Sequence, residues 1–216
     1  MFSTAVITIF FLIVLLFSVI IHELSHGYVA NSLGDPTAKY AGRLTLNPIK
    51  HLDPFGSVIL PLLFLLISFL PGGQPFIFGW AKPVPINPYN FKDQKWGTLK
   101  VSIAGPLSNF AVALVFGLFI RFFSYPQLAP LIQLFSIIVF LNILLGLFNL
   151  IPIPPLDGSW ILFRFLPAGA ERVRVFLQQY GFFIIIFLLF SGILNGVSVL
   201  INLIFYAITG TYFGIA

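Results

Sequence analysis

The placement of charged residues constrains the fold of this chain more than any other sequence feature, because it leaves long windows with no charge at all. These windows are residues 1–21, 101–120, 122–156 and 175–216. Each is long enough to cross the hydrocarbon core of a bilayer as an α-helix. Hydrophobic residues make up 59% of the 216 residues and charged residues 8%, which excludes an ordinary soluble domain. We therefore predict an all-α membrane protein, a polytopic helical bundle.

The segments between these windows are polar or rich in proline, and they predict departures from regular helix. Residues 31–54 predict a loop with one or two short strands, and the alternating prolines of 80–96 favour a strand or a re-entrant strip. The apolar stretch 56–70 is only about four helical turns long and contains Pro61, so we expect it to be re-entrant. The C-terminal region, about 175–212, fits either one long helix or two shorter ones.

The distribution of Lys and Arg predicts the topology. If 56–70 is re-entrant, ten of the eleven basic residues fall on one side of the membrane and only Arg121 on the other, which marks the first side as cytoplasmic. The first and third full spans are then parallel, with the N-terminus outside. No repeat or linker divides the chain, so we predict a single membrane domain over 1–216, with a three-helix core at about 4–166. The net charge of +5 includes no basic run, so we expect no nucleic-acid partner.

The clearest chemical signal is the motif His22-Glu23-Leu24-Ser25-His26, near the end of the first apolar window. On a helix, His22 and His26 lie on one face, and Glu23 can reach a water on the same metal ion. The alternative is that the histidines are polar packing residues inside the bundle. That alternative is costly for three ionisable groups within five positions of a span, so we predict a metal site.

A third protein ligand is needed to complete such a site, and without cysteine it must be His, Asp or Glu. The candidates are His51, Asp35, Asp53, Asp93, Asp157 and Glu171. Asp157 stands out because it follows an apolar span in a segment where three prolines prevent regular helix. Unwound backbone at membrane depth is tolerated only where it is buried in protein or lines a wet cavity. A surface turn at Asp157-Gly158 explains the same residues equally well.

The motifs together resemble the site-2 protease family of intramembrane zinc metalloproteases, in its compact prokaryotic branch without a PDZ or CBS domain. The resemblance rests on His22-Glu-Leu-Ser-His26, Ala104-Gly105-Pro106-x-x-Asn109 and Asn149-Leu-Ile-Pro-Ile-Pro-Pro-Leu-Asp157-Gly158, with further likeness at 42–56 and 79–88. It covers roughly residues 20–158, and the C-terminal region carries no diagnostic motif. We expect Gly105 and Asn109 to let two helices approach closely rather than to take part in the chemistry.

The resemblance implies roles for individual residues. It implies that His22, His26 and Asp157 bind one Zn²⁺ per chain and that Glu23 is the general base. Asn149 would stabilise the oxyanion or position the substrate, whereas a helix C-cap is its alternative role.

We therefore predict an intramembrane zinc endopeptidase that hydrolyses peptide bonds within or near the transmembrane helices of membrane proteins, with its active site toward the cytoplasmic leaflet. A substrate helix has no free backbone carbonyl, so the scissile region must first unwind. The extended strip could clamp it by strand addition, through Val84, Pro85, Ile86 and Asn87. Two other functions stay open: a metal transporter, and a catalytically silent membrane adaptor. The sequence also leaves open whether the protein forms a homo-oligomer.

Overall fold

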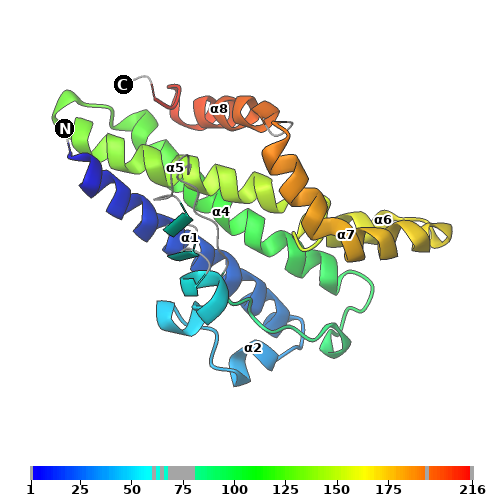
Figure 1. The fold of residues 1–216 in the computed structure, drawn as a ribbon. Helices are drawn as coiled ribbons and strands as arrows, with labels where there is room; N and C mark the ends of the chain where they lie inside the picture. The colour runs from blue at the N-terminus through cyan, green and yellow to red at the C-terminus, as the bar shows by residue number, and fades with distance from the viewer. Residues whose placement is uncertain (1, 60–61, 64–65, 68–80, 193–194, 215–216) are drawn as a thin grey trace.

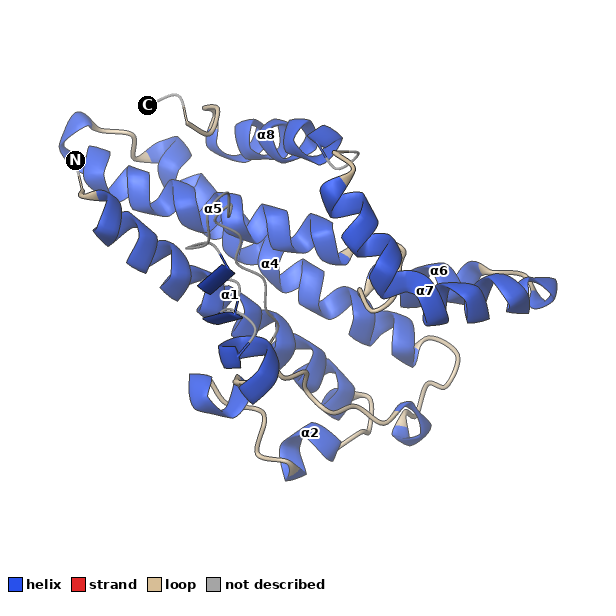
Figure 2. Cartoon of the chain, viewed as in Figure 1, coloured by secondary structure: helices blue, strands red, loops and turns tan. Residues whose placement is uncertain are grey.

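The chain folds into a helical bundle in a computed structural model (Figure 1). The structure describes residues 2–59, 62–63, 66–67, 81–192 and 195–214. Throughout these ranges every regular element is a helix (Figure 2). The α-helices are α1 (Thr4–Ser32), α2 (Thr37–Tyr40), α4 (Gly97–Phe122), α5 (Ala129–Asn149), α6 (Gly158–Phe165), α7 (Glu171–Phe190) and α8 (Asn195–Thr209).

Four of these helices are long and apolar enough to cross a membrane. They are α1, α4, α7, and α5 together with the short helical turn that precedes it from Pro126. Each satisfies its backbone hydrogen bonds internally, as hydrocarbon requires. The prediction of a multi-pass membrane protein built from helices is therefore confirmed for the described residues.

Helix α4 packs against both α1 and α5, and α1 also contacts α5. Figure 1 shows the N-terminus of α1 at the same end of the bundle as the connection between α4 and α5. Helices α1 and α5 therefore run in one direction and α4 in the other. This arrangement brings the second half of α1, the first half of α4 and the C-terminal end of α5 to the same level of the bundle.

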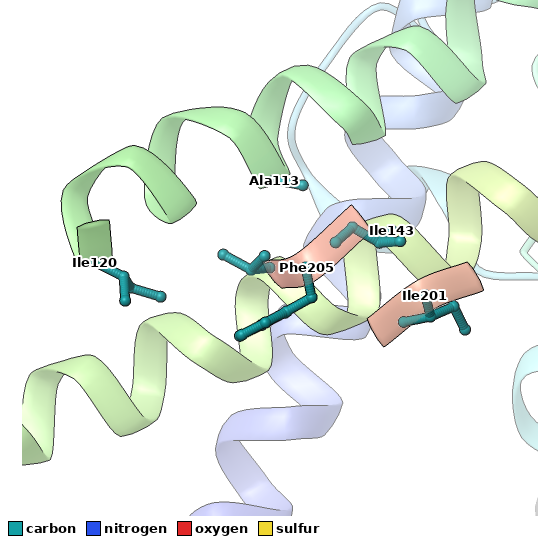
Figure 3. Close-up of a cluster of buried hydrophobic side chains, with 6 residues drawn as sticks. Ala113, Ile120, Ile143, Ile201 and Phe205 are labelled. Carbon is teal, nitrogen blue, oxygen red and sulfur yellow. The ribbon is translucent and has the colours of Figure 1, made fainter. Parts of the chain in front are cut away.

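The C-terminal region forms two helices rather than one. Helix α7 ends at Phe190, and Gly192 has a φ of 73°, a left-handed conformation that ends helices readily because glycine has no Cβ. Helix α8 then packs against α4 and α5. Its residues Ile201 and Phe205 join Ala113, Ile120, Val139 and Ile143 in a buried apolar cluster (Figure 3).

The strands expected in the polar segments are absent from the described residues. Residues 31–54 instead form α2 and a single turn of 3₁₀ helix, η1 (Pro48–His51). Residues 81–87, called the strip below, form no regular element, and Asn87 at their end has extended backbone angles. Prolines at 83 and 85 have no N–H, so they remove the donors that a ladder would need. Of the expected re-entrant stretch, only a short π-helical turn, η2 (Pro54–Ile59), and two pairs of residues are described, and the rest lies outside the described residues.

Candidate metal centre

Helix α1 supplies two imidazoles to one point in the bundle. His22 and His26 are spaced by four residues, so their side chains lie one above the other on the face of α1 that α4 covers. Both are 6% exposed. Their rings meet edge to face with centroids 4.6 Å apart, and their Nε2 atoms are separated by 3.0 Å.

The segment that follows α5 brings Asp157 to the same point. Its three prolines prevent α5 from continuing, and the chain makes tight turns until α6 begins at Gly158. A Cβ at Gly158 would collide with the Leu150 and Ile151 carbonyls, and one at Gly181 of α7 with the Pro154 carbonyl. Glycine at both positions therefore lets this segment fold closely back on α5 and α7.

The Asp157 carboxylate completes a cluster of three oxygen and nitrogen atoms. Asp157 Oδ2 lies 3.0 Å from His22 Nε2 and 3.2 Å from His26 Nε2. His22, His26 and Asp157 are the one group of three metal-ligating side chains found among the described residues. The structure thus brings together both histidines of the motif and one of the six candidate third ligands.

This cluster fits a metal ion better than it fits hydrogen bonding. His26 Nδ1 lies 2.7 Å from the Val101 carbonyl oxygen, which only accepts, so Nδ1 carries a proton and the neutral ring presents a lone pair at Nε2. Asp157 Oδ2 is buried without a hydrogen-bond partner. Tetrahedral zinc with bonds of about 2.0–2.1 Å separates its ligand atoms by about 3.3 Å, close to the separations here. A cation therefore satisfies acceptors that would otherwise repel one another.

Helix α4 leaves space for such a cation. A Cβ built at Gly105 would overlap His26 Nε2 and crowd the imidazole of His22. Glycine at this position keeps the gap between the two Nε2 atoms open. The expectation that Gly105 allows close helix approach is confirmed, and the space it leaves adjoins the Nε2 atoms of His22 and His26.

A cavity of about 280 Å³ opens beside the cluster. His22, His26 and Asp157 line it, as do Glu23 and Asn149. The strip also lines the cavity, through Val84 and Ile86. The side chains expected to act on a substrate therefore face one space, together with the candidate metal ligands.

The strip is held in place by side chains from distant segments. The Val84 N–H donates to Glu23 Oε2 at 2.7 Å. The Arg43 guanidinium, which is 8% exposed, donates to the carbonyl oxygens of Lys82 and Pro83 at 3.0 and 3.2 Å. Sequence reasoning missed Arg43, because nothing in the local sequence indicates which carbonyls a guanidinium will reach.

Asp35 fastens the other end of the strip. Its carboxylate, fully buried, accepts hydrogen bonds from the Asn87 N–H, the Asn90 amide and both the N–H and hydroxyl of Thr37. Burial raises the pKa of Asp35, but these hydrogen bonds, led by the Thr37 hydroxyl, lower it more and hold it below its usual value. Asp35 therefore remains ionised as an anchor.

The other candidate third ligands also lie elsewhere. His51 is buried and donates from Nε2 to the Thr45 carbonyl at 2.8 Å. Asp53 accepts from the N–H groups of Gly56 and Phe55 at the start of η2. Asp93 pairs with Lys100 at 2.7 Å, and Glu171 is the first residue of α7.

The fold and the site together define a helical membrane protein with a buried His-His-Asp group suited to zinc, and comparisons with known proteins identify its family. A profile described as "Peptidase family M50" matches residues 124–192. The "Putative zinc metalloprotease YwhC" of Bacillus subtilis (strain 168) is 43% identical over 186 residues, covering 83% of this chain and 79% of the relative. The chain therefore belongs to peptidase family M50, the site-2 protease family of zinc metalloproteases.

Two other relatives agree with this membership. The "Putative zinc metalloprotease Rip2" of Mycolicibacterium smegmatis is 31% identical, covering 83% of this chain and 66% of the relative. The "Zinc metalloprotease MJ0392" of Methanocaldococcus jannaschii is 29% identical, covering 90% of this chain and 47% of the relative. No solved structure matches the chain significantly.

Replacing Gly105 by alanine tests whether the space beside the two imidazoles holds the metal ion. The added methyl group would lie closer than van der Waals contact to both Nε2 atoms, so Gly105→Ala should lose nearly all bound zinc, as measured by elemental analysis of the purified protein. Gly196→Ala on α8 is the matched control, because a Cβ there meets nothing within 4 Å. Full zinc occupancy in folded Gly105→Ala would contradict the proposed position of the metal.

Proposed function

We propose that this protein is an intramembrane zinc endopeptidase that cuts peptide bonds within or near the transmembrane helices of membrane proteins. The observation that carries the proposal is the cluster of His22, His26 and Asp157, buried among apolar helices, with Glu23 on the same cavity. Such a cavity gives water and an unwound peptide a place to meet inside a helical bundle. Family membership supports the reaction class.

The three clustered side chains bind one zinc ion per chain in this proposal. Two imidazoles and one carboxylate make a three-ligand set that leaves a fourth position open, as catalytic zinc sites require. When bound, zinc supplies a Lewis acid that polarises the scissile carbonyl and lowers the pKa of a water molecule. The convergence of the three ligand atoms supports this assignment.

Glu23 acts as the general base and then as the general acid. It follows His22 directly and lines the cavity, so its carboxylate can accept a proton from the attacking water. The same carboxylate can return that proton to the leaving nitrogen. The hydrogen bond from the Val84 N–H fixes one of its oxygens, which orients the carboxylate.

Asn149 donates to the oxyanion that develops on the scissile carbonyl. One hydrogen of its amide is used within α5, by the Leu145 carbonyl at 3.0 Å. The amide carries a second hydrogen, and the side chain lines the cavity. A donor fixed in advance near the reacting carbonyl stabilises the transition state without having to reorient.

The strip binds the unwound substrate by strand addition. Val84 and Ile86 line the cavity and would contact substrate side chains, while Pro85 between them is exposed. Asn87 anchors the strip, since its N–H is bonded to Asp35. An extended segment pinned by Glu23 and Asp35 loses little further entropy when a peptide aligns beside it.

The chain acts as a single membrane domain over 1–216 in this proposal. Helices α1, α4 and α5 form its catalytic core, and the stretch 56–70 is re-entrant. The positive-inside rule then sets the N-terminus outside and the active site toward the cytoplasmic leaflet. The substrates are single-pass membrane proteins that reach the site within the lipid bilayer.

The two rival functions have less support. A metal transporter needs polar groups spaced along a pore, whereas the candidate metal ligands here form one compact cluster. A silent adaptor needs neither Glu23 nor a cavity beside the three clustered side chains. Both features are present together on one face of the core.

Replacing Glu23 by glutamine distinguishes these functions. Because a general base contributes about 10²- to 10⁴-fold to rate, Glu23→Gln should reduce cleavage of a transmembrane-helix reporter by at least about 100-fold. Zinc content should stay at the wild-type level, since Glu23 is not a proposed ligand. Unchanged cleavage would reject the protease mechanism.

Removing the Arg43 hydrogen bonds tests whether the strip binds the substrate. A hydrogen bond from a charged group is worth about 1.5–3 kcal/mol, so Arg43→Met should lower kcat/KM for the reporter by about tenfold or more. The zinc content should not change. Arg121→Met is the control, because Arg121 also donates to a backbone carbonyl, that of Ala207. Equal effects of the two substitutions would contradict a role of the strip in substrate binding.

A further inference from the structure

A chain of buried polar side chains leads from His22 across all three core helices. It consists of Asn109 on α4, Asn142 on α5 and Ser18 on α1, called the amide relay below. Asn109 and Asn142 are fully buried, and Ser18 is 3% exposed. Polar groups in such surroundings are costly unless each is hydrogen-bonded, so the relay needs an explanation.

The donor and the acceptor of each hydrogen bond in the relay can be assigned, beginning with the bond to a backbone carbonyl on α5. Asn142 Nδ2 donates to the Ile138 carbonyl at 2.9 Å, and a carbonyl can only accept. The amide nitrogen of Asn142 is thereby identified, and its Oδ1 must face Asn109. Asn109 Nδ2 lies 3.0 Å from that Oδ1 and therefore donates to it.

The orientation of Asn109 is fixed a second time by α1. Its Nδ2 also lies 3.3 Å from the Ser18 carbonyl oxygen, another group that only accepts. Both amide hydrogens of Asn109 are thus directed at acceptors, and its Oδ1 faces His22. The Ser18 hydroxyl supports the arrangement by contacting Asn142 Nδ2 at 2.9 Å.

The last hydrogen bond of the relay places a proton on Nδ1 of His22. Asn109 Oδ1 lies 2.7 Å from His22 Nδ1, and an amide oxygen only accepts, so Nδ1 carries the proton. In the neutral ring, His22 Nε2 is left with its lone pair, 3.0 Å from Asp157 Oδ2. The Val101 carbonyl does the same for His26.

The three contacts lie at consecutive turns of one helix. Val101, Gly105 and Asn109 are spaced by four residues and share a face of α4. The carbonyl of the first bonds His26, the second leaves space beside both imidazoles, and the side chain of the third bonds His22. One face of α4 therefore sets the tautomer of each histidine and leaves room for the ion.

We propose that Asn109 is a positioning residue that holds His22 with its proton on Nδ1 and its Nε2 lone pair directed at the metal, while Asn142 and Ser18 fix the orientation of the Asn109 amide. This inference rests on the proposed function in taking His22 as a zinc ligand. Partners that bond the second nitrogen of a metal-bound histidine typically contribute about 10- to 100-fold to metal affinity.

Two substitutions at Asn109 separate positioning from packing. Asn109→Leu keeps the size but removes the acceptor, so the zinc dissociation constant, measured by chelator competition, should rise about 10- to 100-fold. Asn109→Asp keeps an acceptor for His22 but cannot donate to Asn142 or Ser18. It should lower thermal stability yet retain zinc affinity near that of the wild type. Asn202→Leu on α8 is the control, because the Asn202 amide bonds only within its own helix in the described structure.

The ring nitrogens of His22 give a direct readout of the tautomer. The chain has three histidines, so selective nitrogen-15 labelling yields a short, assignable spectrum of the purified protein. Because zinc bound at Nε2 places the proton on Nδ1 in any variant, the spectra are recorded on zinc-free protein. There the wild type and Asn109→Asp should show a protonated Nδ1 at His22, and Asn109→Leu should lose this preference. If Asn109→Leu does not fold, Asn109→Asp decides alone: loss of the Nδ1 proton or of zinc from the folded variant overturns the proposal.

The outcomes separate this inference from the proposed function. Wild-type protein without zinc would reject the metal assignment, while the His22 tautomer in wild type and variants would still test the relay. Zinc bound equally by the wild type and Asn109→Leu would reject the relay and leave the metal site intact. Zinc affinity that falls in proportion to thermal stability in both Asn109 variants would mean that Asn109 only packs the helices, which also overturns the proposal.

Discussion

The rest of the structure depends on the meeting of two imidazole nitrogens and one carboxylate oxygen inside a bundle of apolar helices. In low dielectric, three such acceptors repel one another unless a cation joins them. Asp157 Oδ2 has no hydrogen-bond partner, and it lies within 3.2 Å of both His Nε2 atoms. A metal ion removes this conflict and links α1 to the segment after α5. The helices around the cluster can therefore be understood as the frame of a metal site.

The packing of the helices around the cluster depends on small residues and on tight turns where backbones approach closely. Gly105 leaves space beside the imidazoles, and Gly158 and Gly181 let the Asp157 segment lie against neighbouring backbone. Because apolar side chains gain little from leaving lipid for the protein interior, such close packing and buried polar contacts specify how the helices assemble. The strip is held separately, by Glu23, Arg43 and Asp35. The proposed metal site and the proposed substrate site are thus supported by different contacts, which meet at Glu23.

The sequence predicted those features that depend on local pattern. Uncharged windows predicted the membrane helices, and the spacing of His22 and His26 predicted their shared face. Asp157 stood out among the candidates because of its proline-rich segment, but only the family resemblance favoured a metal ligand over a surface turn at this position. The predicted strands are absent from the described residues, because the prolines remove ladder donors and distant side chains bond the backbone instead. The contacts of Asn109 and Arg43 could not be predicted, because their partners are distant in the sequence. Asn109 contacts His22, 87 residues away. Arg43 contacts Lys82 and Pro83, 39 and 40 residues away.

The metal content of purified protein tests the central claim most directly. Wild-type protein and Asp157→Ala would be purified in detergent, supplied with zinc, freed of excess metal and subjected to elemental analysis. We expect about one zinc per chain in the wild type and a sharp loss in Asp157→Ala, because two imidazoles alone do not make a three-ligand site. Folded wild-type protein that holds no stoichiometric zinc after resupply would contradict the account.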